Sequence, residues 1–158
     1  MITIKGIKDE DFVNYKEPSM FIAFPSCTWK CEKECGMRVC QNSALATAKN
    51  IEITPQEIVA RYLDNPITKA FVLGGLEPMD SWTDLCSLID VIRVQTLDTI
   101  IIYTGYKKEE IKGLLYWLSR YPNMIIKFGR YIPDQKSHYD ETLGIYLASN
   151  NQYAERIS

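Results

Sequence analysis

Short apolar runs alternate with amphipathic segments along this chain, and their order restricts the fold more than any other property of the sequence. Residues 69–73, 99–103 and 124–128 are apolar enough to form strands buried on both faces, and residues 20–24 give the first strand of the series. Parallel strands need crossover connections, and the segments between these runs have helical periodicity. The sequence therefore predicts an α/β fold with a mainly parallel sheet, built as a layer or as a partial (βα) barrel.

The expected helices have recognisable starts and apolar stripes. Thr54, Pro55 and Glu57 combine an N-cap, a proline at the first helical position and the glutamate of a capping box, which predicts a helix that runs to about Asp64. Two later helices are indicated by apolar residues at the i, i+3, i+4, i+7 spacing of a core-facing stripe. These residues are Leu85, Leu88, Ile89 and Ile92 in the first helix, and Ile111, Leu114, Leu115 and Leu118 in the second.

The loops that follow the strands contain the least ordinary residues of the sequence. Ligands of parallel α/β folds bind at the carboxyl ends of the strands, so these loops are where chemistry is expected. They hold a cysteine cluster after the first strand, Gly74-Gly75-Leu76-Glu77-Pro78 after the second, Thr104-Gly105-Tyr106 after the third and Gly129-Arg130-Tyr131 after the fourth. We expect all four loops to lie along one rim of the sheet.

The composition is that of one domain, which we expect to span residues 1–158. The chain has 158 residues, 46% of them hydrophobic, and a formal net charge of −2, which disfavours nucleic acid as a main partner. No stretch approaches the roughly 20 apolar residues of a membrane span, and residues 1–10 lack the apolar segment of a signal peptide. We therefore predict no membrane association and a cytoplasmic location, where cysteine thiols stay reduced.

Four of the five cysteines lie close together, at Cys27, Cys31, Cys35 and Cys40. Thiolates on one loop are ligands for zinc or for an iron–sulfur cluster. Structural zinc sites usually take two separated pairs of cysteines, whereas this group lies on a single short loop. A cluster held by three cysteines leaves one iron open to a substrate or cofactor, which favours a catalytic site. A zinc site and unrelated free thiols remain as alternatives at this point.

The glycine pair after the second strand points to the same rim. Two glycines allow the backbone to approach a ligand closely, and Glu77 together with exposed carbonyl groups can receive an ammonium group. Without the cysteines, a plain strand-to-helix turn would be the better interpretation of this motif.

Together, these residues resemble the radical S-adenosylmethionine (SAM) superfamily, which has a C-x3-C-x2-C motif after the first barrel strand and a Gly-Gly-Glu-Pro-like motif after the second. Cys27 and Cys31 supply the first spacing, and Val39-Cys40-Gln41-Asn42 matches the ending found in glycyl-radical-enzyme activases. Removal of residues 32–37 restores the family spacing. The resemblance therefore implies a 4Fe-4S cluster held by Cys27, Cys31 and Cys40, with Cys35 in an inserted segment. Leu76 is a second departure, because it interrupts the Gly-Gly-Glu-Pro order.

Further motifs resemble the activating proteins of class III anaerobic ribonucleotide reductases, which are small and carry little beyond the partial barrel. The matching segments are 74–78, 103–106, 127–133 and 147–154. This resemblance implies an enzyme that uses a 4Fe-4S cluster, SAM and a low-potential electron donor to form a 5′-deoxyadenosyl radical. The radical would remove a hydrogen atom from a glycine of the partner, the glycyl radical subunit of an anaerobic ribonucleotide reductase. No side chain of the chain itself is expected to act as an acid, base or nucleophile.

The resemblance also assigns roles to residues of the rim. Gly74, Gly75 and Glu77 would receive the methionine ammonium of SAM, Thr104 would bond its carboxylate or ribose, and the backbone near Val39 would meet adenine. Thr104 also fits an ordinary turn residue. Arg130 suits the cofactor carboxylate, the partner or a solvated surface position.

Two further residues have structural interpretations, and two alternative functions stay open. His138 is expected on a polar surface loop, and Cys86 is expected to be a small buried residue on a helix. Another radical SAM enzyme, which activates a different glycyl radical enzyme or modifies a peptide, has the same motifs. A non-catalytic iron–sulfur or zinc-binding module is the alternative from a different class, and it would have no use for the open rim.

Overall fold

The computed structural model describes residues 1–25 and 47–158. Its strands, in chain order, are β1 (Ile2–Ile4), β2 (Gly6–Asp11), β3 (Ser19–Phe24), β4 (Ile51–Ile53), β5 (Ala70–Gly75), β6 (Thr99–Tyr103), β7 (Met124–Phe128), β8 (His138–Asp140), β9 (Ile145–Leu147) and β10 (Tyr153–Arg156). Its helices are α3 (Pro55–Leu63), α4 (Trp82–Gln95) and α5 (Lys112–Leu118), with two short 3-10 helices, η1 (Pro78–Ser81) and η2 (Lys108–Glu110).

A six-stranded sheet in the order β10-β7-β6-β5-β3-β2 forms the centre of the fold. Its four inner strands, β3, β5, β6 and β7, run parallel, and the edge strands β2 and β10 are antiparallel to their neighbours. The two remaining pairs, β1 with β4 and β8 with β9, form small antiparallel sheets. This confirms the predicted α/β fold with a mainly parallel sheet, and it is consistent with a partial barrel.

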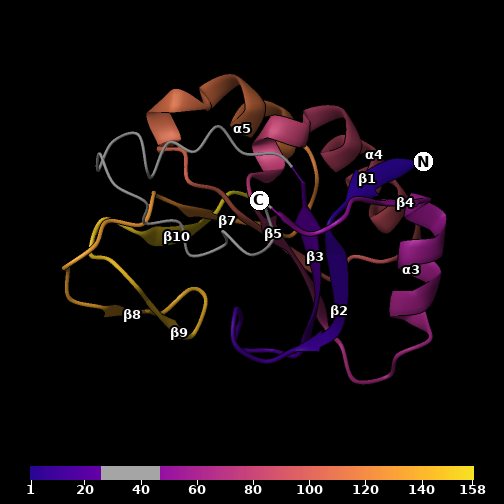
Figure 1. Ribbon diagram of the computed structural model, residues 1–158, viewed down its shortest axis with the longest axis horizontal. Coiled ribbons are helices and arrows are strands. Elements are labelled where there is room, and N and C mark those ends of the chain that lie inside the picture. Colours follow the sequence, from indigo (N-terminus) through magenta and orange to yellow (C-terminus); the bar gives the residue numbers. More distant parts are fainter. Residues whose placement is uncertain (26–46) are drawn as a thin grey trace.

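The three helices pack on one face of the large sheet, along the top and right of Figure 1. Alternate strand residues point toward them, so that Phe71 and Leu73 of β5 join the same buried cluster as Leu88 and Ile92 of α4. The stripes predicted for α4 and α5 are largely buried, although Leu114 is only partly so. Burial of these apolar faces holds the helices against the sheet.

The opposite face of the sheet is also buried. Ala70 and Val72 of β5 lie there, with Ile101 of β6, and they belong to a second cluster that includes Tyr15 and Leu143 from connecting segments. The β8–β9 hairpin, at the lower left of Figure 1, adds Leu147 of β9 to this cluster. The strands are therefore buried on both faces, as their continuous apolar runs predicted.

Helix α3 shows how the local sequence sets an element boundary. The Thr54 hydroxyl accepts a hydrogen bond from the Glu57 N–H at 3.1 Å, and the Glu57 carboxylate accepts one from the Thr54 N–H at 3.1 Å. Pro55 follows as the first helical residue, and the helix ends at Leu63 with Asp64 as its C-cap. The predicted capping box is therefore present, and the boundaries of α3 agree with the sequence.

Two expectations from the sequence need correction. Strand β5 extends to Gly75 instead of ending at Leu73, so both glycines belong to the strand. His138 begins β8 and is partly buried, whereas the sequence suggested a surface loop. The edge strand β2 was not anticipated, because its sequence, Gly-Ile-Lys-Asp-Glu-Asp, has little apolar content.

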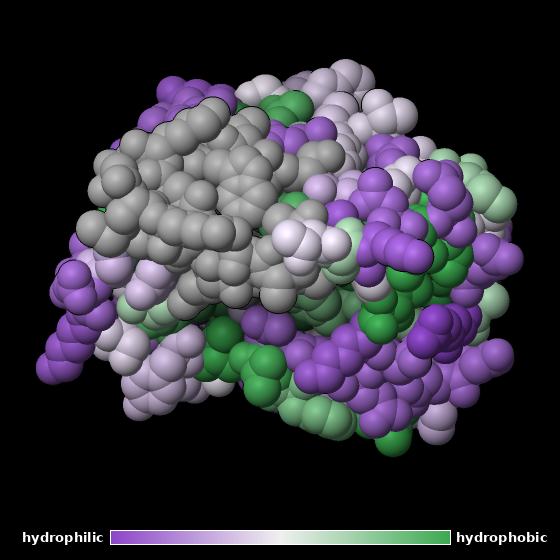
Figure 2. Space-filling model, in the orientation of Figure 1, coloured by the Kyte–Doolittle hydropathy of each residue, from purple (hydrophilic) through white to green (hydrophobic). Residues whose placement is uncertain are grey.

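The surface shown in Figure 2 has a broad hydrophilic area at its lower right, with a smaller hydrophobic patch beside it. Large exposed apolar side chains include Val94 near the end of α4 and Trp117 on α5. Within residues 1–25 and 47–158, no helix has both the length and the apolar character needed to cross a membrane.

Candidate functional site

The turns after β5, β6 and β7 lie at one edge of the sheet, because these strands are parallel neighbours. We call these turns together with the end of β7, residues 76–80, 104–106 and 127–130, the rim. The backbone N–H of Thr104 donates to the Lys127 carbonyl at 2.9 Å, and the N–H of Gly129 donates to the Tyr106 carbonyl at 3.2 Å. The sequence prediction that these loops meet is therefore confirmed for all three.

The Glu77 carboxylate joins two turns of the rim. One oxygen, Oε1, accepts hydrogen bonds from the Met79 N–H at 3.1 Å and from the Thr104 hydroxyl at 2.9 Å. The other oxygen, Oε2, accepts from the Gly105 N–H at 2.8 Å. The side chain thus links the turn after β5 to the turn after β6, and two of its three hydrogen bonds cross between strands.

Glu77 is almost completely buried, with 5% of its surface exposed. Loss of hydration raises the pKa of its carboxyl to about 7, against an ordinary value of 4.5. The hydrogen bonds from Gly105, Met79 and Thr104 oppose this rise, and the nearby Asp80 charge adds to it. The rim therefore contains a carboxyl group that changes its charge near neutral pH.

Strand packing requires glycine at position 75 and leaves little room for a side chain at position 74. Gly75 has a φ of +88°, and a Cβ there would come within 2.7 Å of the Phe24 backbone nitrogen. A Cβ at Gly74 would come within 3.0 Å of the Phe21 ring. Both positions pair directly with β3, at Ala23 and Phe24. The close approach of β3 accounts for Gly75 without a ligand, and the predicted role of both glycines in ammonium binding stays a prediction.

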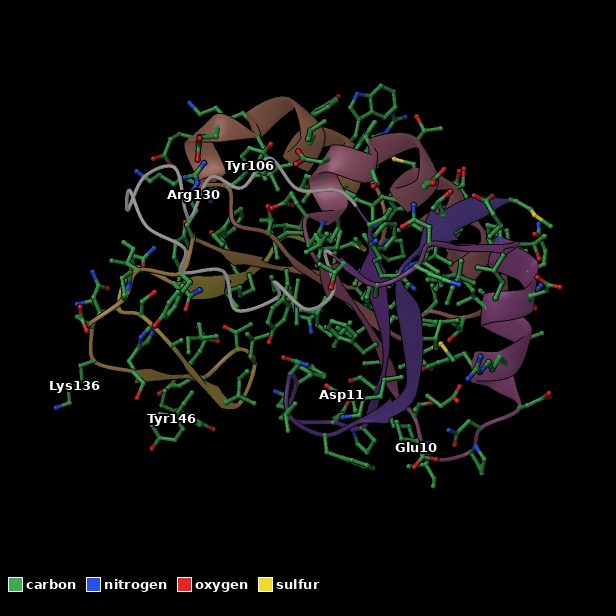
Figure 3. The ribbon with its side chains drawn as sticks, in the orientation of Figure 1. Glu10, Asp11, Tyr106, Arg130, Lys136 and Tyr146 are labelled. Carbon is green, nitrogen blue, oxygen red and sulfur yellow. The ribbon has the colours of Figure 1, made fainter. Side chains whose placement is uncertain are left out.

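Arg130 is buried in the rim, with 4% of its surface exposed. Its guanidinium pairs with both carboxylate oxygens of Glu110, each at 2.8 Å. It also lies over the Tyr106 ring, 5.8 Å from the centroid, and Figure 3 shows these two side chains next to each other. The reading of Arg130 as a solvated surface arginine is therefore wrong, because the side chain is held inside the rim.

Sequence reasoning missed three side chains of this region. Lys127 is 7% exposed at the end of β7, where its ammonium donates to the Gly129 carbonyl at 3.1 Å and lies 5.5 Å from the centre of the Tyr103 ring. Asp80 and Tyr106 form a hydrogen bond across two turns. The signal for Lys127 was available, because it is the one charged residue in an otherwise apolar strand. The contact between Asp80 and Tyr106 depends on tertiary structure and had no sequence signal.

A cleft of about 480 Å³ opens beside the rim. It joins Pro25, which follows β3, to Asp80 and Asp84 near the start of α4 and to Thr3 of β1. The Thr3 N–H donates to the Asp84 carboxylate at 3.0 Å, so β1 is tied to α4 at this point. Most of the side chains that line the cleft are polar, which suits a polar ligand.

The predicted cluster ligands Cys27, Cys31 and Cys40 lie outside the described residues, as do Val39 and Cys35. Among residues 1–25 and 47–158, no group of three or more His, Cys, Asp or Glu side chains is arranged to hold a metal ion. The described part of the chain contains one cysteine, Cys86, which is half-buried on α4. This distribution favours the segment 26–46 as the source of thiolate ligands.

Comparison with protein families identifies the class of the chain. Residues 20–152 match the family described as a 4Fe-4S single cluster domain, which covers most of the chain. The chain therefore belongs to this iron–sulfur, metal-binding family, which is typical of radical SAM enzymes. Comparisons with curated proteins and with solved structures gave no significant match.

Proposed function

We propose that this chain is a radical SAM activase that installs a glycyl radical on an anaerobic ribonucleoside-triphosphate reductase, and that residues 1–158 act as one domain. The proposal combines the 4Fe-4S family assignment with the motifs at 74–78, 103–106 and 127–133. Membership of an iron–sulfur family, together with a polar cleft beside the rim, suggests an enzyme. Under this proposal the cofactors are a 4Fe-4S cluster and SAM, and the electron comes from a low-potential donor.

The position of the cysteine segment carries the proposal. It follows β3, and β3 is parallel to β5, so the segment begins at the edge where Glu77 and Thr104 are buried. A cluster bound by this segment would have its thiolate ligands close in sequence to the end of β3. Family membership accounts for the cluster. The buried polar groups beside that edge supply the hydrogen-bond acceptors and the positive charge that a second, zwitterionic ligand needs.

The charges of the rim suit an amino-acid ligand. When bound, a reduced 4Fe-4S cluster supplies the electron that cleaves SAM to methionine and a 5′-deoxyadenosyl radical, which takes a hydrogen atom from glycine. The carboxylate of Glu77 and nearby backbone carbonyls offer acceptors to an ammonium group, whereas Lys127 offers a buried positive charge to a carboxylate. Thr104 lies between these two charged groups in the strand order, and its hydroxyl already donates to Glu77 and accepts from the Tyr106 N–H.

The structure limits how Glu77 takes part. Its carboxylate already accepts hydrogen bonds from Met79, Thr104 and Gly105, so a ligand ammonium would share acceptors that the chain uses. We infer that Glu77 chiefly holds the turns in place and contributes negative charge. The carbonyl groups of the same turn would then supply the direct contacts.

Two alternatives make different demands on the rim. Another radical SAM enzyme, acting on a different glycyl radical enzyme or on a peptide, would use the same groups with another partner. A non-catalytic iron–sulfur or zinc module needs no second ligand, and burial of Glu77, Lys127 and Arg130 at one rim would serve only structure. Detection of a glycyl radical on the ribonucleotide reductase separates the first alternative from the proposal.

The test uses the anaerobically reconstituted protein with SAM, a strong reductant and the anaerobic ribonucleotide reductase from the same cell. Electron paramagnetic resonance should detect a glycyl radical on the reductase. The matched control is Cys40→Ala, which should give none. If the protein cleaves SAM under these conditions but the reductase carries no radical, the reductase is not the partner.

A further inference from the structure

Tyr106 connects the three turns of the rim. Its phenol hydroxyl donates to Asp80 Oδ1 at 2.6 Å, and its backbone N–H donates to the Thr104 hydroxyl at 3.1 Å. Its carbonyl accepts from the Gly129 N–H at 3.2 Å. One residue after β6 is therefore bonded to the turn after β5, to its own turn and to the turn after β7.

The contacts of Tyr106 extend to an ion pair between the buried Arg130 and the more exposed Glu110. The Arg130 guanidinium lies over the Tyr106 ring, and it forms a two-point pair with Glu110 at the end of η2. In Figure 3, Tyr106 and Arg130 lie next to each other, beside helix α5. The two-point pair restricts rotation of the Arg130 guanidinium, and the guanidinium lies beside the Tyr106 ring, 5.8 Å from its centroid.

Two acidic residues of one turn hold the same neighbouring turn. Glu77 accepts from Thr104 and Gly105, and Asp80, three residues later, accepts from Tyr106. Each residue of the turn at 104–106 is thus bonded to an acid of the turn after β5. Hydrogen bonds are directional, so this set fixes the position of Thr104 and the Gly105 backbone more closely than apolar packing would.

We propose that Asp80 and Tyr106 are positioning residues for SAM binding, which act by holding Thr104 and Gly105 in place against Glu77. This inference rests on the proposed function, because the ligand is the one named there. Neither Asp80 nor Tyr106 needs to touch that ligand. Their contribution is to keep the binding groups of two separate strands at a fixed spacing, which removes the cost of ordering them when the ligand arrives.

The test begins with three variants. Tyr106→Phe removes one hydroxyl and keeps the ring beside Arg130, and Asp80→Ala removes the acceptor. Asp80→Asn keeps an acceptor oxygen for Tyr106. The first two variants should each weaken SAM binding by about three- to tenfold in the reconstituted protein, with unchanged iron and sulfide content. Asp80→Asn should restore most of the affinity, and the double variant Asp80→Ala/Tyr106→Phe should bind no more weakly than either single variant.

A matched control comes from another tyrosine–aspartate pair. The hydroxyl of Tyr121 donates to Asp90 Oδ1 at 2.5 Å, before β7 begins and therefore at the opposite end of that strand from the rim. Tyr121→Phe makes the same chemical change away from Thr104 and Gly105. It should leave SAM affinity unchanged, which separates a positioning effect from general destabilisation.

A measurement without ligand distinguishes failure of this inference from failure of the proposed function. Hydrogen exchange of the Gly105 amide, which donates to Glu77, should be several-fold faster in Tyr106→Phe than in the wild-type protein and unchanged in Tyr121→Phe. Unchanged exchange in Tyr106→Phe would overturn the positioning role, as would unchanged SAM affinity. If exchange is faster in Tyr106→Phe but the wild-type protein does not bind SAM, the link between the turns stands and the proposed function fails.

Discussion

The Thr104 hydroxyl donates a hydrogen bond of 2.9 Å to Glu77, although the two residues are 27 positions apart and follow different strands. Both side chains are buried, at 2% and 5% exposure. The bond brings together two residues to which the family resemblance gave separate roles toward one cofactor. It also ties the position of Thr104 to the protonation state of Glu77, because an ionised carboxylate is the stronger acceptor.

The first prediction concerns the pH dependence of stability. The pKa of Glu77 is about 7 in the folded chain and near 4.5 when the chain is unfolded, so between these values the folded state binds more protons. The free energy of unfolding should therefore fall as pH rises from 4.5 to 7, by about 3 kcal/mol from this group alone. Urea unfolding at pH 4.5 and pH 7.5 should show that Glu77→Gln lacks this part of the decrease.

The matched control for that prediction is Glu109→Gln, which changes an exposed glutamate of η2. It should keep the full wild-type dependence on pH. If Glu77→Gln and the wild-type protein lose the same stability over this interval, then the pKa of Glu77 does not differ between the folded and unfolded chain.

The second prediction concerns the cluster ligands. With Cys40 as the third ligand, removal of the inserted residues 32–37 restores the family's three-and-two cysteine spacing, and Val39 and Asn42 match the family residues on either side. With Cys35 as the third ligand, the spacing would be three and three. Cys40→Ala should therefore lose both bound iron and SAM cleavage after anaerobic reconstitution, whereas Cys35→Ala should keep both. The reverse pattern in iron analysis would make Cys35 the ligand.

The third prediction concerns the start of α3. The Thr54 hydroxyl accepts from the Glu57 N–H, and Thr54→Ala leaves that donor without its acceptor. The variant should lose about 1 kcal/mol of unfolding free energy in urea titrations. Thr54→Ser keeps an acceptor oxygen and should lose only a few tenths of that amount. Equal losses in both variants would show that the capping hydrogen bond is not what stabilises this helix.

The sequence predicted the inner part of the fold well, because the local pattern and the tertiary environment agree there. Strands β6 and β7 have the predicted boundaries, since each is a mainly apolar run buried on both faces. The edge strands are different. Strand β10 has the sequence Tyr-Ala-Glu-Arg, and its pairing with β7 supplies hydrogen bonds that no apolar pattern announces.

The candidate site was predicted in outline and not in its contacts. The sequence indicated that the turns of Glu77 and Thr104 would meet, because parallel strands end at one edge. It could not indicate that these side chains bond to each other, or that Tyr106 reaches Asp80, because such contacts depend on the spacing of folded strands. Arg130 shows the same limit, since its burial follows from pairing with Glu110 on a separate element.

Reductive cleavage of SAM is the most direct test of the proposed chemistry. The protein should be reconstituted with iron and sulfide without oxygen, reduced strongly, and mixed with SAM, and the products should be separated by chromatography. We expect 5′-deoxyadenosine and methionine in equal amounts, with none from Cys40→Ala. A protein that carries a complete 4Fe-4S cluster and still leaves SAM intact would contradict the proposed function.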